Sequence, residues 1–171
     1  MRTAGIVGGM KCKMKSVLIS IRPEWVEKIA SGEKTIEVRK TVPKEVPFKC
    51  YIYMTQGTYK NLGLYSEDIY QNRMKVIGEF ICDKVYLIKN QRNRFVVANE
   101  EQGVTNEIAR QSCLDYDDMV NYLGNKDGYG WHIADLKIYD KPRELSEFWG
   151  RKKLTRPPQS WQYVEELGNE S

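Results

Sequence analysis

The sequence predicts an α+β fold in which a small, partly open barrel of mixed or antiparallel β-strands is flanked by short helices. Three observations support this. Segments typical of strands outnumber those typical of helices. Most of them follow one another without the long helix that a parallel crossover needs. The chain has 171 residues, 41% of them hydrophobic, which suits one domain with one core.

The first elements are a strand, a helix and a second strand. Residues 16–21 (SVLISI) predict the first strand. Pro23 suits a first helical turn, and apolar residues recur after it at helical spacing, so a short amphipathic helix follows and Gly32 ends it as a C-cap. Residues 35–39 then alternate and predict a half-buried strand, with isoleucine and valine on one face and polar residues on the other.

The central part of the chain predicts two longer strands around a loop. Residues 49–55 (KCYIYMT) indicate a strand with two largely apolar faces. Residues 56–73 are polar and contain glycine, so they predict a long loop. Residues 75–87 (KVIGEFICDKVYL) return to strand character, with a bulge or bend expected at Gly78.

The last third predicts two helices and two strands. Residues 104–123 favour two short helices, the second capped by Asp115 and ended by Gly124. Residues 128–139 (GYGWHIADLKIY) predict a last long strand. Prolines keep the following tail extended, and residues 161–164 predict a short edge strand.

The domain is expected to cover residues 14–167, between a flexible leader at residues 1–13 and a tail at residues 168–171. The leader is interrupted by glycines and lacks the apolar core of a signal peptide. Apolar runs are only a few residues long, far short of the roughly 20 that cross a membrane. A cytoplasmic protein without a membrane segment is therefore predicted.

Cysteine and histidine usage argues against a metal site. Cys12, Cys50, Cys82 and Cys113 lie 38, 32 and 31 residues apart, without a Cys-x-x-Cys pair, and His132 is the one histidine of the sequence. His132 should point away from Trp131, as an ordinary surface side chain. Reduced, buried thiols are expected, with no metal and no cofactor.

The charge is unevenly distributed along the chain, whose net charge is +4. Residues 1–44 hold ten Lys and Arg against four Asp and Glu, residues 45–136 ten against thirteen, and residues 137–156 seven against three. If the fold brings the two basic segments together, they form one positive surface suited to a phosphate-bearing ligand. The alternative is ordinary solubilising charge.

The densest cluster of chemical groups is Gly32-Glu-Lys-Thr-Ile-Glu-Val-Arg39, where a helix end turns into a strand. Lys34 offers a point charge for phosphate, and Arg39 offers a planar fork for phosphate or a base edge. Glu37 could orient either cation or accept a hydrogen bond from an exocyclic amine. The alternative is an exposed Glu-x-Arg pair on a solvated strand face.

This motif, Gly32-x-Lys34-x-x-Glu37-x-Arg39, resembles the signature of the ASCH domain family. The likeness extends from Met14 to Val164 through four further stretches. These are Ser20-Ile-Arg-Pro-Glu24, Val76-Ile-Gly-Glu-Phe80, Gly128-Tyr-Gly-Trp131 and Arg156-Pro-Pro-Gln-Ser-Trp161. The resemblance implies a PUA-like β-barrel whose signature lines a cleft proposed to bind RNA or a nucleotide.

The leading functional hypothesis is therefore a non-catalytic RNA- or nucleotide-binding domain, with Lys34, Glu37 and Arg39 at its site. One branch of the family hydrolyses N4-acetylcytidine with a Lys, a Thr and a Glu, and Lys34 matches that lysine. The branch's threonine falls at Glu37, Thr35 lies two residues earlier, and its glutamate has no assigned counterpart. A small amidohydrolase acting on a modified nucleoside, using Lys34, Thr35 and Glu37, is the alternative.

Four further residues are candidates for the binding site. Tyr53 could stack a base or pack in the barrel, and Arg22 could contact phosphate or pair with a nearby glutamate. Gln159 and Ser160 could supply hydrogen bonds at a cleft rim, whereas the tryptophans of the C-terminal motifs favour packing. RNA or a modified nucleoside or nucleotide is the expected partner. A domain that docks an acidic protein is a third possibility.

Overall fold

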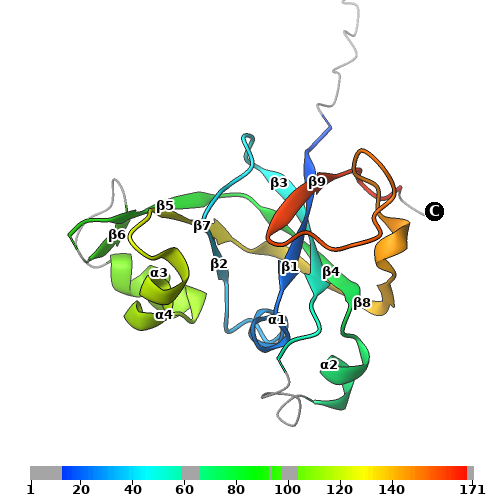
Figure 1. The fold of residues 1–171 in the computed structure, drawn as a ribbon, viewed down its shortest axis with the longest axis horizontal. Coiled ribbons are helices and arrows are strands. Elements are labelled where there is room, and N and C mark those ends of the chain that lie inside the picture. Colours follow the sequence, from blue (N-terminus) through cyan, green and yellow to red (C-terminus); the bar gives the residue numbers. More distant parts are fainter. Residues whose placement is uncertain (1–12, 59–65, 93, 98–103, 169–171) are drawn as a thin grey trace, which may run out of the picture.

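The computed structural model describes residues 13–58, 66–92, 94–97 and 104–168, and the expected leader at residues 1–13 lies almost wholly outside them. Two sheets and short helices form the fold (Figure 1). The five-stranded sheet has the order β8-β4-β3-β1-β9, and the four-stranded sheet the order β2-β7-β5-β6. β1 and β3 run parallel, and the other neighbours run antiparallel. The mixed α+β class predicted from the sequence is confirmed.

The strand bounds follow chain order. They are β1 (Ser16–Ile21), β2 (Ile36–Arg39), β3 (Phe48–Met54), β4 (Lys75–Cys82), β5 (Val85–Asn90), β6 (Phe95–Val97), β7 (Gly128–His132), β8 (Ala134–Arg143) and β9 (Trp161–Val164). The helices are α1 (Pro23–Ala30), α2 (Glu67–Gln71), α3 (Val104–Ser112), α4 (Tyr116–Leu123) and a 3₁₀ turn, η2 (Leu145–Glu147). The two sheets do not close into a barrel in the part of the chain described here.

The helix boundaries agree with the local signals. α1 begins at Pro23, and Gly32 just beyond its end has a φ of +79°, a conformation that favours glycine. Asp115 and Asp118 form a reciprocal capping box at the start of α4, because each side chain accepts a hydrogen bond from the other residue's backbone N–H. Gly124 ends α4 with a φ of +64°.

The two long strands predicted at residues 75–87 and 128–139 are wrong as single elements. Each divides at a corner between the sheets: β4 gives way to β5 around Asp83, and β7 to β8 at Ile133. Both runs turn side by side, since Ile81 pairs with Ala134 in one sheet and Val85 pairs with Trp131 in the other. The apolar pattern continues through the corner, so the sequence alone carries no sign of the change of sheet.

Other differences concern segments between strands. Residues 56–73 contain the short helix α2, while residues 59–65 of that predicted loop lie outside the described chain. β6 was not predicted. At Gly78 the expected irregularity is present as a register shift against β8, where an added Cβ would lie 2.5 Å from the carbonyl oxygen of Lys137. That close approach requires glycine.

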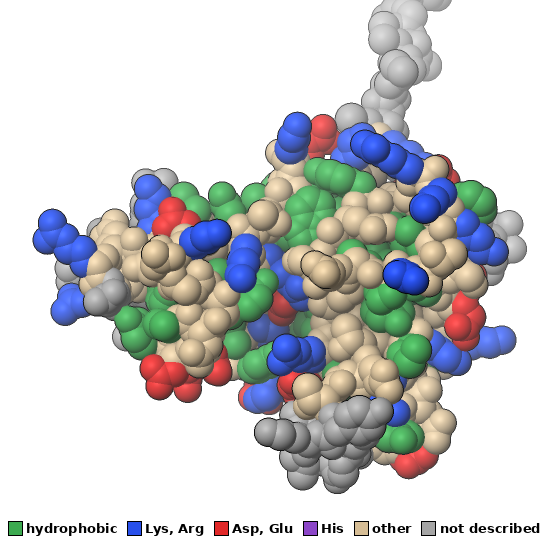
Figure 2. Space-filling view, viewed as in Figure 1, with side chains coloured by type: hydrophobic (Ala, Val, Ile, Leu, Met, Phe, Trp, Pro, Cys, Tyr) green, Lys and Arg blue, Asp and Glu red, His purple; other side chains and the backbone are tan. Residues whose placement is uncertain are grey.

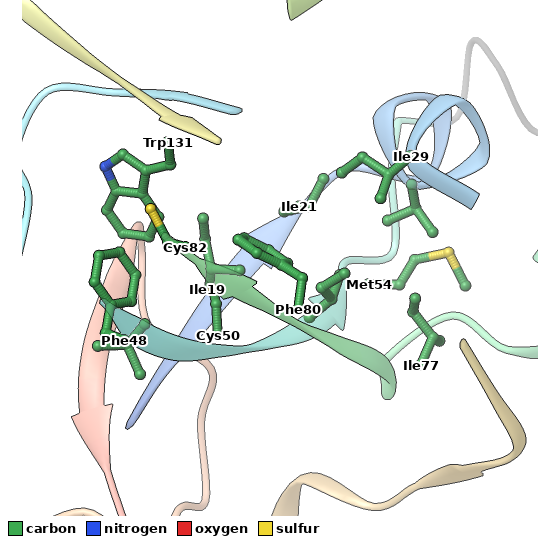
Figure 3. Close-up of a cluster of buried hydrophobic side chains, with 13 residues drawn as sticks. Ile19, Ile21, Ile29, Phe48, Cys50, Met54, Ile77, Phe80, Cys82 and Trp131 are labelled. Carbon is green, nitrogen blue, oxygen red and sulfur yellow. The ribbon is translucent and has the colours of Figure 1, made fainter. Parts of the chain in front are cut away.

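The main core lies against the larger sheet and includes the indole of Trp131 from β7 of the smaller one (Figure 3). Trp131 is 0% exposed and meets Phe48 edge to face at a centroid distance of 5.0 Å. A second cluster joins the smaller sheet to α3 and α4, and a third covers the outer face of the larger sheet. Trp131 therefore ties the two sheets together.

The basic N-terminal segment meets residues 161–164 in the fold. β1 pairs with β9, so the first and last strands are neighbours. Beyond the sheet, the indole N–H of Trp161 donates to Thr41 Oγ1 at 2.9 Å, and the backbone N–H of Lys44 donates to the Tyr163 hydroxyl at 3.2 Å. These contacts do not involve the basic segment at residues 137–156, so a joint positive surface stays a prediction.

Neither a membrane-spanning helix nor a metal-binding cluster is found among the described residues. No helix there is long and apolar enough to cross a membrane. No three His, Cys, Asp or Glu side chains gather there in a way that could hold a metal ion.

Candidate functional site

Lys34, Glu37 and Arg39 form one buried ion cluster, which we name the β2 cluster. The Lys34 ammonium lies 3.2 Å from Glu37 Oε2. The Arg39 guanidinium contacts Glu37 Oε1 through Nε at 3.0 Å and Nη2 at 2.9 Å. The three residues are 2%, 6% and 7% exposed, respectively. The predicted motif is brought together, and the alternative of a solvated Glu-x-Arg pair is wrong.

Local geometry explains the closeness of the three side chains. Gly32 lets the chain turn out of α1, and the backbone N–H of Lys34 then donates to the Lys28 carbonyl at 2.9 Å. Glu37 and Arg39 are two residues apart on β2 and so share a face. The other face carries Ile36 and Val38 into the second core cluster. The expected half-buried strand is therefore buried on both faces.

Four other parts of the chain cover the β2 cluster. The Lys34 ammonium donates to the Ser112 carbonyl at the end of α3, at 2.6 Å, and lies 5.2 Å from the ring centroid of Trp25 on α1. Arg39 donates to the carbonyl of Ser20 at 2.8 Å and to the hydroxyl of Ser160 at 3.3 Å. The cluster thus links β2 to α1, to α3, to the end of β1 and to the segment before β9.

The carboxylate of Glu37 is held in its charged form. Burial alone raises the pKa of Glu37, but Lys34 and Arg39 beside it outweigh that effect, so the pKa lies below its ordinary value of 4.5. At neutral pH the cluster then contains two cations and one anion. One positive charge is left over in a region with little water to screen it.

This lowered pKa makes one contribution to stability depend on pH. The stabilisation is present in full above about pH 4.5 and is lost as the pH falls through the lower pKa of folded Glu37. We expect the difference in unfolding free energy between the wild type and Glu37→Gln to stay constant from pH 7 to 5 and to shrink at lower pH. Urea denaturation at successive pH values measures it. A difference that does not change down to pH 3 would contradict the charged pair.

β2 lies by a hollow on the molecular surface. Figure 2 shows this hollow between the lobe that carries α3 and α4 and the larger body, with basic and acidic side chains at its floor. β2 runs through the same region in Figure 1. Lys40 follows the cluster and is exposed, and its ammonium lies 5.1 Å from the ring centroid of Tyr122 on α4. Tyr122 is 36% exposed, and its hydroxyl lies close to Arg39 of the cluster.

Tyr122, Trp25 and Ser112 are the site residues that sequence reasoning missed. Burial raises the pKa of Tyr122, while Arg39 acts in the opposite direction, because the phenol lies close to that guanidinium. Ser112 contributes a backbone carbonyl, which no side-chain pattern can reveal. Trp25 is one of the apolar residues at helical spacing after Pro23, and only the cation contact with Lys34 identifies its second role.

The other predicted site residues divide between this region and distant ones. Ser160 joins the cluster through Arg39. Arg22 and Gln159 are exposed. Arg22 follows β1, and Gln159 precedes Ser160. Tyr53 is 5% exposed in the third core cluster, so its packing alternative holds and it is not part of the site. Thr35 is partly exposed, and its backbone N–H and carbonyl bond to Gln111 and Ile133.

Comparisons with known proteins identify the fold. No protein-family model matches the sequence, and no curated protein is similar to it. Among solved structures, the chain is similar to ASCH from Zymomonas mobilis, with a TM-score of 0.61, 20% identity and 89% of each chain covered. A tyrosine-to-phenylalanine mutant of that protein gives a TM-score of 0.60 and 19% identity over 89% of this chain and 91% of that one. The chain therefore has the fold of the ASCH domain, as its sequence signature predicted.

Proposed function

We propose that this protein binds RNA along a positively charged surface whose floor is the β2 cluster. The observation that supports this most directly is the surplus cation buried beside the hollow, where two basic groups share one carboxylate. Phosphate groups are the anions that such a surface fits, and they dominate the affinity of RNA-binding proteins. The fold shared with ASCH proteins agrees with this proposal.

In this proposal the buried cluster holds the site rigid, and exposed residues near it contact the RNA. Arg39 already bonds to Glu37, Ser20 and Ser160, so it stiffens the site. Contacts to phosphate come from two exposed cations close to the cluster, since Lys40 follows it in the chain and Arg22 lies two residues beyond Ser20. Arg22 follows β1 directly, and Lys40 follows Arg39. The exposed part of the Tyr122 ring offers a stacking surface, and stacking is worth about 1–3 kcal/mol per base.

The test measures fluorescence anisotropy of labelled single-stranded RNA, duplex RNA and transfer RNA at two salt concentrations. We expect affinity to fall steeply with salt, and both Arg22→Ala and Lys40→Ala to weaken binding and reduce the salt slope by about one each. These exposed substitutions leave the buried cluster intact. The control is Lys75→Ala, which should bind RNA as the wild type does. Lys75 lies on β4 of the larger sheet and pairs with Glu144.

Two outcomes would argue against RNA binding at this surface. Binding that does not respond to salt would remove phosphate contact as its basis. Equal affinities of the Arg22→Ala, Lys40→Ala and Lys75→Ala variants would move the interaction to another part of the molecule.

The amidohydrolase alternative gains no specific support from the geometry of Lys34. A lysine that acts as a base or nucleophile needs a free lone pair on its nitrogen. The Lys34 nitrogen instead donates to the Ser112 carbonyl and faces the Glu37 carboxylate. Release of acetate from N4-acetylcytidine by the wild type, abolished in Lys34→Ala, would reverse this conclusion.

A further inference from the structure

A second polar cavity lies away from the β2 cluster, on the outer face of the larger sheet. Its volume is about 360 Å³. Cys50 and Ile52 of β3 point into the main core, so the alternate residues Lys49 and Tyr51 point to the outer face. The side chains around the cavity are Lys49, Tyr51, Glu79, Lys137, Tyr139 and Arg143, and the segment at Leu167 and Gly168 forms one wall.

Strand register fixes the centre of the cavity. Tyr51 on β3 is directly opposite Glu79 on β4, and Glu79 is directly opposite Lys137 on β8. These three residues form one cross-strand row, since opposite residues of paired strands project to the same side. The row therefore depends on the sheet itself and not on a loop.

Glu79 is the acceptor at the centre of this row. Its carboxylate accepts a hydrogen bond from the Tyr139 hydroxyl and lies 3.6 Å from the Lys49 ammonium. Burial raises the pKa of Tyr139, and the bond to Glu79 raises it further, so the phenol keeps its proton. Since two carboxylate oxygens offer about four acceptor positions, Glu79 can also accept from a ligand hydroxyl.

Three cations and one acid line the cavity, and Arg143 also pairs with Glu147 at 3.2 Å. Lys137 and Arg143 converge on Tyr139, at 5.9 Å and 5.8 Å from the centre of its ring. Lys49 pairs with Glu166 at 2.8 Å as well as with Glu79. Both cations lie near one ring of the cavity, and lysine and arginine are the side chains that bind phosphate groups.

We propose that this cavity binds a phosphate monoester that carries hydroxyl groups, with the phosphate at Lys137 and Arg143 and a hydroxyl at Glu79. Small-molecule sites typically measure roughly 300–1,000 Å³, so a volume at the lower end fits a ligand of mononucleotide size. Two sources share this chemistry: a free nucleoside monophosphate and the 5′-terminal phosphate of an RNA. The proposal goes beyond the RNA-binding surface and does not depend on it.

Isothermal titration calorimetry with adenosine 5′-monophosphate, adenosine and inorganic phosphate tests the proposal. We expect the wild type to bind adenosine 5′-monophosphate more tightly than adenosine or inorganic phosphate. Lys137→Ala should lower the affinity for the monophosphate and for inorganic phosphate about tenfold, the loss expected for one charge-assisted hydrogen bond. Lys89→Ala, an exposed lysine of the smaller sheet, is the matched control and should change neither value.

Glu79→Gln separates the two halves of the ligand. Without the carboxylate charge, inorganic phosphate should bind more tightly, while the advantage of the monophosphate over phosphate should shrink, because an amide oxygen accepts a hydroxyl more weakly than a carboxylate does. Lys49 keeps Glu166 as its partner, so this variant should fold, as its thermal unfolding will show. No binding of either anion to the wild type, or equal losses in Lys137→Ala and Lys89→Ala, would overturn the proposal.

A comparison of 5′-phosphorylated with 5′-hydroxyl RNA identifies the source. A preference for the phosphorylated RNA that Lys137→Ala removes assigns the cavity to RNA ends, whereas monophosphate binding without that preference assigns it to free nucleotides. The two proposals fail separately, because Arg22→Ala and Lys40→Ala test the β2 surface and Lys137→Ala tests the cavity.

Discussion

Replacing Glu37 by glutamine is expected to lower the free energy of unfolding by about 3–5 kcal/mol, because it removes the only carboxylate of the β2 cluster. Lys34 and Arg39 would remain buried with neutral partners, including the Ser112 and Ser20 carbonyls. A neutral amide cannot offset two buried positive charges. Urea denaturation at pH 7, followed by the fluorescence of the four tryptophans, measures the change.

The control for this substitution is Glu33→Gln, four residues earlier. Glu33 pairs with Lys28 at 2.7 Å, but its side chain is 59% exposed. Water screens such pairs, so the unfolding midpoint should stay near that of the wild type. Equal midpoint shifts in the two variants would show that burial does not strengthen the Glu37 interactions.

Replacing Trp131 by alanine is expected to cost about 3–5 kcal/mol of unfolding free energy, the range for removing a large aromatic side chain from a core. The indole is fully buried and meets Phe48 and Trp161 edge to face, at centroid distances of 5.0 Å and 5.8 Å. Because Trp131 belongs to the smaller sheet and packs in the core of the larger one, its loss should loosen the contact between the sheets.

Trp131→Phe distinguishes ring packing from hydrogen bonding. The indole Nε1 is buried without a hydrogen-bond partner among the described residues, so removing it breaks no bond. Trp131→Phe should therefore lose less than half as much stability as Trp131→Ala in the same urea experiment. A similar loss in both variants would mean that the indole nitrogen, and not the ring, supports the core.

Local elements were predictable where a few neighbouring residues carry the whole signal. Pro23 and Gly32 mark the limits of α1, and Asp115 marks the start of α4. The sheet corners at Asp83 and Ile133 were not predictable, because the strands there change pairing partners while their apolar pattern continues. Strand pairing depends on residues far away in the chain.

The site shows the same division. The spacing of Lys34, Glu37 and Arg39 predicted that their charges lie together, since residues two apart on a strand share a face. Their burial was not predictable, because it depends on Ser112 and Ser160, which lie more than 70 residues further along the chain.

The pairing of β1 with β9 has a consequence for how the chain folds during synthesis. Ser16 pairs with Val164, so this edge of the larger sheet forms only after β9, which follows the other described strands in the chain, has been translated. Until then the hydrophobic β1 presents an open edge, which favours association between nascent chains. Arg39 can form its hydrogen bond to Ser160 only after that residue has been translated, so the β2 cluster is also completed late.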